Sequence, residues 1–399
     1  MVKRETFFQA AHFIRLRNTR QLLRAALGLM IATCCVGAQA ATDIKSIKLP
    51  QGFHIELLTD RVPSAREMTL GKTQDAHTIL FVGSSDAGKV YAVSLDRGRA
   101  TDVRTIASGL QRPVGVAYRD GSLYVSAVSR ILRIDKVDGA FDRMSSPTLV
   151  TDHFPMETHH GWKFIAFGPD GNLYIPVGAP CNICERDENR FYNIQRIRAD
   201  GTGQTVVAHG IRNTVGFDWN PVDGSLWFTD NGRDMLGDDI PSDELNRVPE
   251  NTTATTHFGF PYCHQGDIPD PEFGNKRSCS QFTPPIAKLG AHVAALGMRF
   301  YSPPLTADEP FPPSFRNGIF IAEHGSWNRS TKSGYRIVFV TVDHANRVVG
   351  QDVFAEGWLG ADESVWGRPA DVLPLPDGSL LVSDDLAGAI YRIRYTPPR

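Results

Sequence analysis

A strand–turn–strand unit that recurs along the chain constrains the fold more than any other feature of the sequence. Its most regular copy has two short apolar strands, Phe164–Phe167 and Leu173–Ile175, joined by the turn Gly168–Gly171. In that turn, proline presets one φ angle, aspartate bonds its own backbone and glycine accepts a positive φ. Five further copies bring the total to six, at residues 75–82, 119–125, 223–228, 315–321 and 376–382.

The spacing of these copies predicts the architecture. Turn glycines at positions 121, 171, 224, 318 and 378 lie 50, 53, 94 and 60 residues apart. Repeats of roughly 40–50 residues that contain only strands and turns are typical of propeller blades with four strands each. The 3.6-residue period of helical repeats is absent. The sequence therefore predicts an all-β fold, a six-bladed β-propeller with four-stranded antiparallel blades.

Two segments near the ends of the chain are expected to close the ring. In the segment Leu49–Thr59, Phe53, Ile55 and Leu57 fall on one face of a strand. Ile390–Tyr395 is the strand-like counterpart at the C-terminal end. Pairing between the two would remove the open edges of the sheets.

The first 40 residues have the pattern of a signal peptide. Basic residues precede the apolar run Ala25–Gly37, and Ala38–Ala40 fits a small-x-small cleavage site. The run is too short to cross a bilayer as a helix. We therefore expect a periplasmic or secreted protein, with a signal peptide over residues 1–40, one propeller domain over residues 41–399 and no transmembrane span after cleavage.

Export would place the four remaining cysteines in an oxidising compartment, which favours disulfides. We expect two local bridges that stiffen long loops, one between Cys263 and Cys279 and one between Cys181 and Cys184. The second pair could also be free. A four-cysteine zinc site is the alternative, although 79 residues separate the two pairs.

The 94-residue interval between turn glycines is long enough for one blade and an insertion. The insertion, residues 250–290, is rich in proline and contains Cys263 and Cys279. Such long excursions from a blade are more often functional than idle. We expect this one to overhang one mouth of the propeller.

Polar and charged clusters stand just before or after the predicted strands, where the loops of a propeller can converge around the axis. His160, four residues before the strand Phe164–Phe167, is the candidate for acid–base chemistry because imidazole titrates near neutral pH. Arginine binds carboxylates in a bidentate way, so a ring of arginines suits a ligand with several carboxylates. For each arginine, the alternative is an ordinary surface side chain paired with an acid. The four arginines that could form such a ring are Arg66, Arg212, Arg329 and Arg368.

Six short motifs follow one another along the chain. They are His159-His160-Gly161 before the Gly-Pro-Asp-Gly turn, Gly210-Ile211-Arg212-Asn213, Asp243-Glu244-Leu245-Asn246, His257-Phe258-Gly259-Phe260-Pro261, His324-Gly325-Ser326-Trp327-Asn328-Arg329 and Gly367-Arg368-Pro369. In order and spacing, these motifs resemble those of the soluble sugar dehydrogenases that depend on pyrroloquinoline quinone (PQQ), the glucose/sorbosone dehydrogenase group. The sequence is most similar to the sorbosone dehydrogenase branch, and the resemblance runs from about Leu49 to Tyr395.

The resemblance implies a six-bladed propeller that holds PQQ and Ca²⁺ at one end of its axis. It implies that His160 is the catalytic base and that Arg212, followed by Asn213, contacts the quinone. It also implies that main-chain carbonyls of Gly232 and Arg233 hold the Ca²⁺. The resemblance also implies cofactor contacts by His324, Arg329 and Arg368. A contact by Arg66 is expected only because Arg66 belongs to the ring of arginines.

The chain also departs from the glucose dehydrogenases. Val215 stands where they have a glutamine, and Trp366 stands where they have a second arginine. We therefore expect hydride transfer to PQQ from a sugar or sugar aldehyde of the aldose or sorbosone type, and glucose itself is not predicted.

The expected partners follow from charge and from the cysteine motifs. The sequence contains no Cys-x-x-Cys-His haem motif, so electrons should leave to a separate quinone or cytochrome. A formal net charge of -2 argues against a nucleic-acid partner. Two alternatives are a calcium-dependent propeller hydrolase, such as a lactonase, and a non-catalytic propeller that binds a protein.

Overall fold

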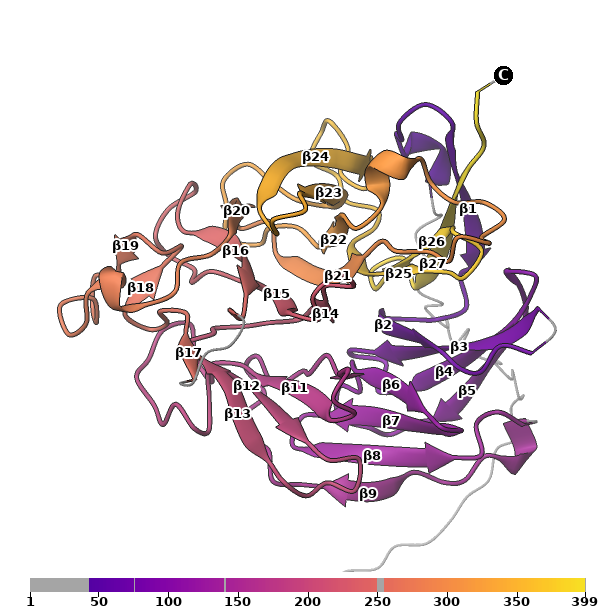
Figure 1. Ribbon diagram of the computed structural model, residues 1–399, viewed down its shortest axis with the longest axis horizontal. Coiled ribbons are helices and arrows are strands. Elements are labelled where there is room, and N and C mark those ends of the chain that lie inside the picture. The colour runs from indigo at the N-terminus through magenta and orange to yellow at the C-terminus, as the bar shows by residue number, and fades with distance from the viewer. Residues whose placement is uncertain (1–42, 75, 140, 250–254, 399) are drawn as a thin grey trace, which may run out of the picture. The chain divides into compact units, whose positions relative to one another are not determined.

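Six antiparallel sheets follow one another around a common centre and form a six-bladed β-propeller, as predicted (Figure 1). The computed structural model describes residues 43–74, 76–139, 141–249 and 255–398, all within one unit, Gln39–Arg399. The predicted signal peptide, residues 1–40, lies outside the described residues. No helix in the described part of the chain is long and apolar enough to span a membrane.

Each blade has four antiparallel strands, which are given below in order from the axis outward. Blade 1 consists of β2 (Ala65–Leu70), β3 (His77–Ser84), β4 (Val90–Asp96) and β5 (Arg99–Ala107). Blade 2 consists of β6 (Val116–Arg119), β7 (Ser122–Ala127), β8 (Arg130–Asp135) and β9 (Thr148–Thr151). Blade 3 consists of β10 (Ala166–Phe167), β11 (Leu173–Val177), β12 (Asn193–Ile197) and β13 (Thr205–His209). Blade 4 consists of β14 (Phe217–Trp219), β15 (Leu226–Asp230), β16 (Ser242–Arg247) and β20 (Ala287–Ala291). Blade 5 consists of β21 (Ala295–Phe300), β22 (Ile319–Glu323), β23 (Arg336–Val342) and β24 (Val348–Glu356). Blade 6 consists of β25 (Pro369–Pro374), β26 (Leu380–Asp384), β27 (Ala389–Tyr395) and β1 (Phe53–Thr59). The 3₁₀ turns are η1 (Ile44–Ser46), η2 (Phe141–Arg143), η3 (Cys279–Gln281) and η4 (Pro313–Phe315).

The apolar core is divided among the six interfaces between adjacent blades. Each interface has its own cluster of buried side chains, because the second strand of a blade is covered on both faces by its neighbours. The second strands β11, β15, β22 and β26 are buried along their whole length. They therefore read as short apolar runs rather than as alternating patterns.

The ring closes by pairing of the chain's two ends, as predicted. β1 forms the outermost strand of blade 6 and runs antiparallel to β27, with Ile55 opposite Ile393. The inward side chain Phe53 packs edge-on against Phe311 and Phe354. Closure leaves blade 6 with four strands and places it beside blade 1.

The turn glycines identified in the sequence join first and second strands at one end of the blades. Gly171 has a φ of +75° and Gly224 one of +74°, a region in which L side chains are strained. Gly318 has a different reason to be glycine, because a Cβ there would lie 2.0 Å from the ring of Phe339. The other end of the blades is left for the longer loops that form the site.

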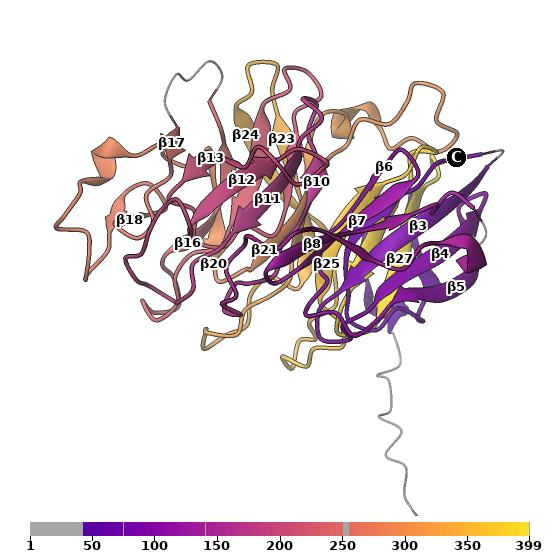
Figure 2. The same ribbon diagram turned by 90° about the horizontal axis from the view of Figure 1, so that it is seen from below.

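The insertion leaves blade 4 between its third and outermost strands. It adds β17 (Thr256–His257) to the edge of blade 3 in parallel to β13, and it forms a small hairpin of β18 (Cys263–His264) and β19 (Ile268–Pro269). Both views place these strands at the periphery of the propeller (Figures 1 and 2). The expected overhang of a mouth is therefore not seen in the described residues.

The four cysteines form the two predicted local disulfides, Cys181–Cys184 and Cys263–Cys279. This arrangement rules out the four-cysteine zinc site. The second bridge ties the hairpin β18–β19 to the turn η3, where the side chains of Tyr262 and Phe282 stack with their planes 7° apart.

Buried acids join the inner strands of different blades around the axis. Glu67 on β2 accepts hydrogen bonds from the main-chain N–H groups of Val116 (3.1 Å) and Ile165 (2.9 Å), which belong to the two following blades. Asp371 on β25 accepts one from the N–H group of Met68 across the closure (2.9 Å). These bonds satisfy donors that the short inner strands leave unpaired.

One arginine supplies the positive charge for this group. The guanidinium of Arg299 lies 3.5 Å from the carboxylate of Asp371 and 3.9 Å from that of Glu67. Burial nevertheless dominates: it raises the pKa of Asp371 to about 6 and holds the pKa of Glu67 well above its usual value. The centre of the propeller therefore retains protons that an unfolded chain would lose.

This shift predicts a pH dependence of stability. The pKa of Asp371 rises from an ordinary 3.8 to about 6 on folding, so the folded state binds the proton more tightly, and stability falls as pH rises between those values. In Asp371→Asn, the loss of unfolding free energy between pH 4 and pH 7 should be smaller than in the wild type by on the order of 2 kcal/mol. Urea denaturation at the two pH values measures it. An unchanged or steeper loss in the variant would contradict the assignment.

The disulfide of the insertion predicts a second effect on stability. Replacing Cys263 and Cys279 with serine removes a bridge between residues 16 positions apart. On the loop-entropy account, this should cost roughly 3 kcal/mol. Chemical denaturation of the double variant and the wild type measures the difference. Equal stability of the two proteins would contradict the prediction.

Candidate active site

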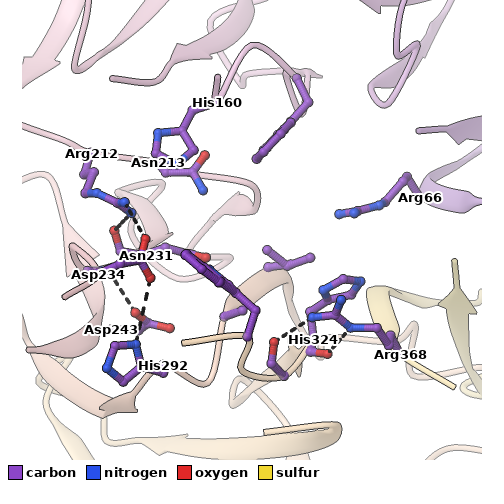
Figure 3. A pocket seen from close by; sticks show the side chains of 16 residues that line it. Arg66, His160, Arg212, Asn213, Asn231, Asp234, Asp243, His292, His324 and Arg368 are labelled. Carbon is purple, nitrogen blue, oxygen red and sulfur yellow. Dashed lines mark hydrogen bonds and ion pairs between the residues drawn. The ribbon is translucent and has the colours of Figure 1, made fainter. Parts of the chain in front are cut away.

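A cavity lies between loops that enter the inner strands and loops that leave the second strands, and Figure 3 shows the side chains that line it. Its volume of about 280 Å³ is close to the lower limit of roughly 300 Å³ typical of small-molecule sites. Blades 1, 3, 4, 5 and 6 all contribute to it. The lining residues are Arg66, His160, Trp162, Arg212, Asn213, Asn231, Gly232, Asp234, Asp243, His292, Ala294, Leu296, His324, Gly325, Trp327 and Arg368.

His160 lies on one wall of the cavity as a neutral imidazole of defined tautomer. Its Nδ1 donates to the carbonyl oxygen of Ala179 (2.9 Å), and because a carbonyl can only accept, Nε2 carries no proton. Burial and the charge of Arg212 hold its pKa well below 6.5. His160 fits there because residue 178 is glycine. A Cβ at position 178 would lie only 2.6 Å from the Cβ of His160.

Arg212 lies beside His160, and hydrogen bonds fix its guanidinium. Nε donates to the main-chain oxygen of Asn182 (2.9 Å), and one terminal nitrogen donates to the side-chain oxygen of the same residue (2.9 Å). The same terminal nitrogen lies 3.1 Å from the carboxylate of Asp234, while the other donates to the carbonyl of Asn231 (3.2 Å). The side chain is therefore a buried cation of fixed position.

Two buried aspartates hold the main chain of this wall. The carboxylate of Asp230 accepts the N–H groups of Arg212 (2.9 Å) and Asn213 (2.6 Å). Asp243 accepts the N–H group of Gly232 (2.8 Å). Burial raises the pKa of Asp230 to about 7 and that of Asp243 to about 6.

The opposite wall is organised around Asp385. Its carboxylate lies 2.8 Å from a terminal nitrogen of Arg66 and 2.8 Å from Nε2 of His324. Arg368 donates to the carbonyl oxygens of His324 (3.0 Å) and Gly325 (2.7 Å). Burial lowers the pKa of His324 to about 4, so this imidazole is also neutral.

The loop after β15 contains both residues predicted to bind calcium. Gly232 lines the cavity, whereas the side chain of Arg233 turns toward the insertion, where it contacts Asp270 (2.6 Å) and Glu272 (3.4 Å). The main-chain carbonyls of Gly232 and Arg233 accept no hydrogen bond from the described residues. The calcium site stays a prediction.

The structure brings most of the predicted site residues together. Arg329 is the exception among the four arginines, because it pairs with Asp239 (3.0 Å) and does not line the cavity. It fits the alternative of a surface arginine paired with an acid. The predicted residues that line the cavity are Arg66, His160, Arg212, Asn213, Gly232, His324 and Arg368.

Sequence reasoning did not single out several residues of the site. Asp385 organises one wall, and its signal in the sequence was its position directly after β26, just as Asp230 ends β15. Asp234 lies 3.1 Å from Arg212 and His292 lies 4.0 Å from Asp234, but neither was predicted as a site residue. Trp327 stands inside a motif noted above and has 69% of its surface exposed at the rim of the cavity.

A family model described as TrAA12-like matches residues 47–396, nearly the whole of the described propeller. The chain belongs to the TrAA12-like family. The predicted resemblance to PQQ-dependent sugar dehydrogenases is thereby confirmed in its coarser part, and the sorbosone branch stays a prediction.

Two relatives and two solved structures illustrate the range of the similarity. An uncharacterized protein of Borreliella burgdorferi is 33% identical over 378 residues, 92% of this chain and 95% of that protein. The PQQ-dependent pyranose dehydrogenase of Coprinopsis cinerea is 21% identical over 300 residues, 62% of this chain and only 41% of that protein.

The solved structures share the fold. The holo PQQ domain of the Coprinopsis cinerea enzyme has a TM-score of 0.71 at 17% identity, covering 87% of this chain and 97% of that domain. An iodide structure of Trichoderma reesei carbohydrate-active enzyme family AA12 has a TM-score of 0.74 at 19% identity, covering 88% of this chain and 98% of the other.

Proposed function

We propose that the protein is a PQQ-dependent oxidoreductase that takes a hydride from a sugar or sugar aldehyde, with His160 as general base. The observation that carries the proposal is the convergence of three arginines and a neutral histidine on one cavity. Family membership supports it, since the matched relative from Coprinopsis cinerea is a PQQ-dependent pyranose dehydrogenase.

The free donors of the cavity fit PQQ, a planar quinone with three carboxylates. The Nε atom of Arg66 is buried and has no hydrogen-bond partner among the described residues. The hydrogen bonds of the Arg368 guanidinium go to carbonyl oxygens, and none within the described residues goes to a carboxylate. Both arginines can bind carboxylates of a ligand. We propose that they hold the cofactor together with Asn213 and His324.

When bound, PQQ would supply an electrophilic quinone that accepts a hydride, chemistry that protein side chains lack. The chain itself has to remove the hydroxyl proton of the substrate. Nε2 of His160 is the acceptor in this proposal, because its lone pair is free while Nδ1–H is fixed to Ala179. The low pKa keeps the base unprotonated at neutral and mildly acidic pH.

Arg212 contributes fixed positive charge beside the base. A buried, preorganised cation stabilises negative charge that develops on a nearby oxygen without reorganising during the reaction. The same charge disfavours protonated His160 and thus promotes loss of the proton after each turnover. Arg212 would therefore serve both halves of the cycle.

Calcium is the second proposed cofactor. Main-chain carbonyls are suitable ligands for this hard cation, and those of Gly232 and Arg233 are free of hydrogen bonds from the described residues. Ca²⁺ held there would add positive charge on the wall of the cavity that contains Arg212. The remaining oxygen ligands would come from the cofactor and from water.

The finer assignments of substrate and partner rest on the sequence. We propose an aldose- or sorbosone-type substrate, a separate quinone or cytochrome as electron acceptor, and a periplasmic or secreted location. The alternative, a calcium-dependent hydrolase, is less well supported because three arginines and three histidines line the cavity.

Reconstitution tests the proposed function. Purified protein supplied with PQQ and Ca²⁺ should reduce an artificial electron-accepting dye in the presence of some members of a panel of aldoses and sugar aldehydes. Protein without PQQ should not. Absence of PQQ binding in a fluorescence titration, together with no dye reduction, would refute the proposal.

Replacement of His160 tests the base. His160→Ala should lower kcat by about 10²–10⁴-fold while PQQ affinity and melting temperature change little. Because the residue has a φ of 48°, His160→Asn is the second variant, since asparagine tolerates this conformation. His159→Ala is the matched control and should be much milder. Normal turnover in the His160 variants with an inactive His159 variant would remove the assignment.

Removal of the metal tests the calcium site. Exhaustive chelation should release PQQ and abolish dye reduction, and Ca²⁺ should restore it better than Mg²⁺, which demands a tighter octahedron and retains its water. Full activity after chelation would exclude calcium from the mechanism.

A further inference from the structure

The connection between β11 and β12 lies behind the wall that contains His160 and Arg212. It begins directly after Val177, at the cavity end of blade 3, and includes the disulfide loop Cys181–Cys184. The sequence marks this loop only by its two cysteines. The structure gives it a more specific relation to the site.

Ala179, at the start of this connection, contacts both proposed catalytic residues through its main chain. Its carbonyl oxygen accepts from Nδ1 of His160 (2.9 Å). Its N–H group donates to the carbonyl oxygen of Arg212 (2.8 Å). One peptide segment therefore sets the positions of the base and of the cation relative to each other.

Asn182, three residues on, holds the guanidinium of Arg212. Its main-chain oxygen accepts from Nε and its side-chain oxygen from a terminal nitrogen, both at 2.9 Å. The same side-chain oxygen accepts the N–H group of Asp234 (2.9 Å), and the side-chain nitrogen donates to the carbonyl of Asp234 (3.1 Å). Asn182 thus joins the disulfide loop, Arg212 and the loop after β15.

The disulfide restricts the place of Asn182. Cys181 and Cys184 flank it on either side, and their bridge closes a loop of four residues. Cys181 and Ile183 also pack against the apolar cluster between blades 2 and 3. A half-exposed loop of this length would otherwise sample many conformations, and the guanidinium would lose its fixed acceptors.

We propose that Asn182 is a positioning residue for Arg212, and that the Cys181–Cys184 disulfide holds Asn182 in the position where it can act. The effect on turnover rests on the proposed function. The effect on the position of Arg212 and on the loop after β15 does not, because it concerns contacts within the protein alone.

A disulfide that merely stiffens a surface loop would behave differently. Its loss would lower the melting temperature and leave the turnover of the folded protein unchanged. Loss of a positioning contact moves a charged group by a fraction of an ångström to an ångström, which can cost up to about 100-fold in rate. Stability and turnover therefore separate the two explanations.

The first experiment uses the protein without PQQ. Hydrogen–deuterium exchange of Asn182→Ala should show faster exchange at the amide of Asp234, which loses its acceptor, and at the amide of Ala179. Asn182→Asp keeps the acceptor oxygens and should restore most of the protection at Asp234. The matched control is Asn189→Ala in the same connection, because the hydrogen bonds of Asn189 to the described residues involve only its main-chain N–H and carbonyl. Unchanged exchange at Asp234 in Asn182→Ala would overturn the proposal.

The second experiment measures turnover of protein loaded with PQQ and Ca²⁺. Asn182→Ala should lower kcat by about 10- to 100-fold with a smaller change in KM. The pair Cys181→Ser/Cys184→Ser should change kcat in the same direction by a smaller factor, whereas Asn189→Ala should match the wild type. A lower melting temperature with normal kcat in Asn182→Ala would overturn the proposal in favour of a structural role.

The two experiments also separate this proposal from the function on which it rests. If wild-type protein shows no PQQ-dependent turnover, the proposed function fails, and the exchange data still decide whether Asn182 holds the loop after β15 and the main-chain contact of Arg212 with Ala179. If turnover is present and Asn182→Ala retains it fully, the proposed function stands and the role of Asn182 in catalysis fails.

Discussion

Pairing of β1 with β27 is the interaction on which the site depends. It completes blade 6 and brings it beside blade 1, so Arg66 meets Asp385 although 319 positions separate them in the chain. The carbonyl of Arg66 also accepts a hydrogen bond from the hydroxyl of Ser383 (2.7 Å). One wall of the cavity therefore exists only in the closed ring, because no local segment contains both of its halves.

Within the ring, two of the cavity arginines are positioned in the same way, by a hydrogen bond from the main-chain N–H of the arginine to an aspartate. In blade 4, Asp230 at the end of the second strand accepts the N–H group of Arg212, which enters the first strand of the same blade. In blade 6, Asp384 at the end of the second strand accepts the N–H group of Arg368 (2.8 Å). Burial raises the pKa of both acids, to about 7 and about 6. Because the first and second strands pair in antiparallel fashion, these hydrogen bonds fix the main chain of each arginine beside the end of the second strand.

These relations explain what the sequence could and could not predict. The fold was predictable because the turn copies report a local pattern that each blade repeats, and Gly171 needs its positive φ whatever surrounds it. The places of His160 and Arg212 at the cavity were predictable, the first from its spacing to such a pattern and the second from the motif Gly210-Ile211-Arg212-Asn213. The roles of Asp385 and Asn182 were not, because their partners come from other parts of the chain. Arg329 pairs with Asp239, a partner that its place in the loop after β22 does not reveal.

The two walls of the cavity differ in how fully their polar groups are satisfied. On one wall, Arg212 is hydrogen-bonded through all three nitrogens and His160 is fixed through Nδ1, so both have set positions before any ligand arrives. On the other wall, Arg66 retains a buried donor, Nε, that has no hydrogen-bond partner in the described part of the chain. A buried unsatisfied donor is costly, and a ligand that satisfies it recovers that cost on binding. On the proposed function, an anionic cofactor would therefore gain most on the wall of Arg66 and Arg368, and the preorganised wall would supply the base. Cofactor affinity and proton transfer would then depend largely on different blades of one ring.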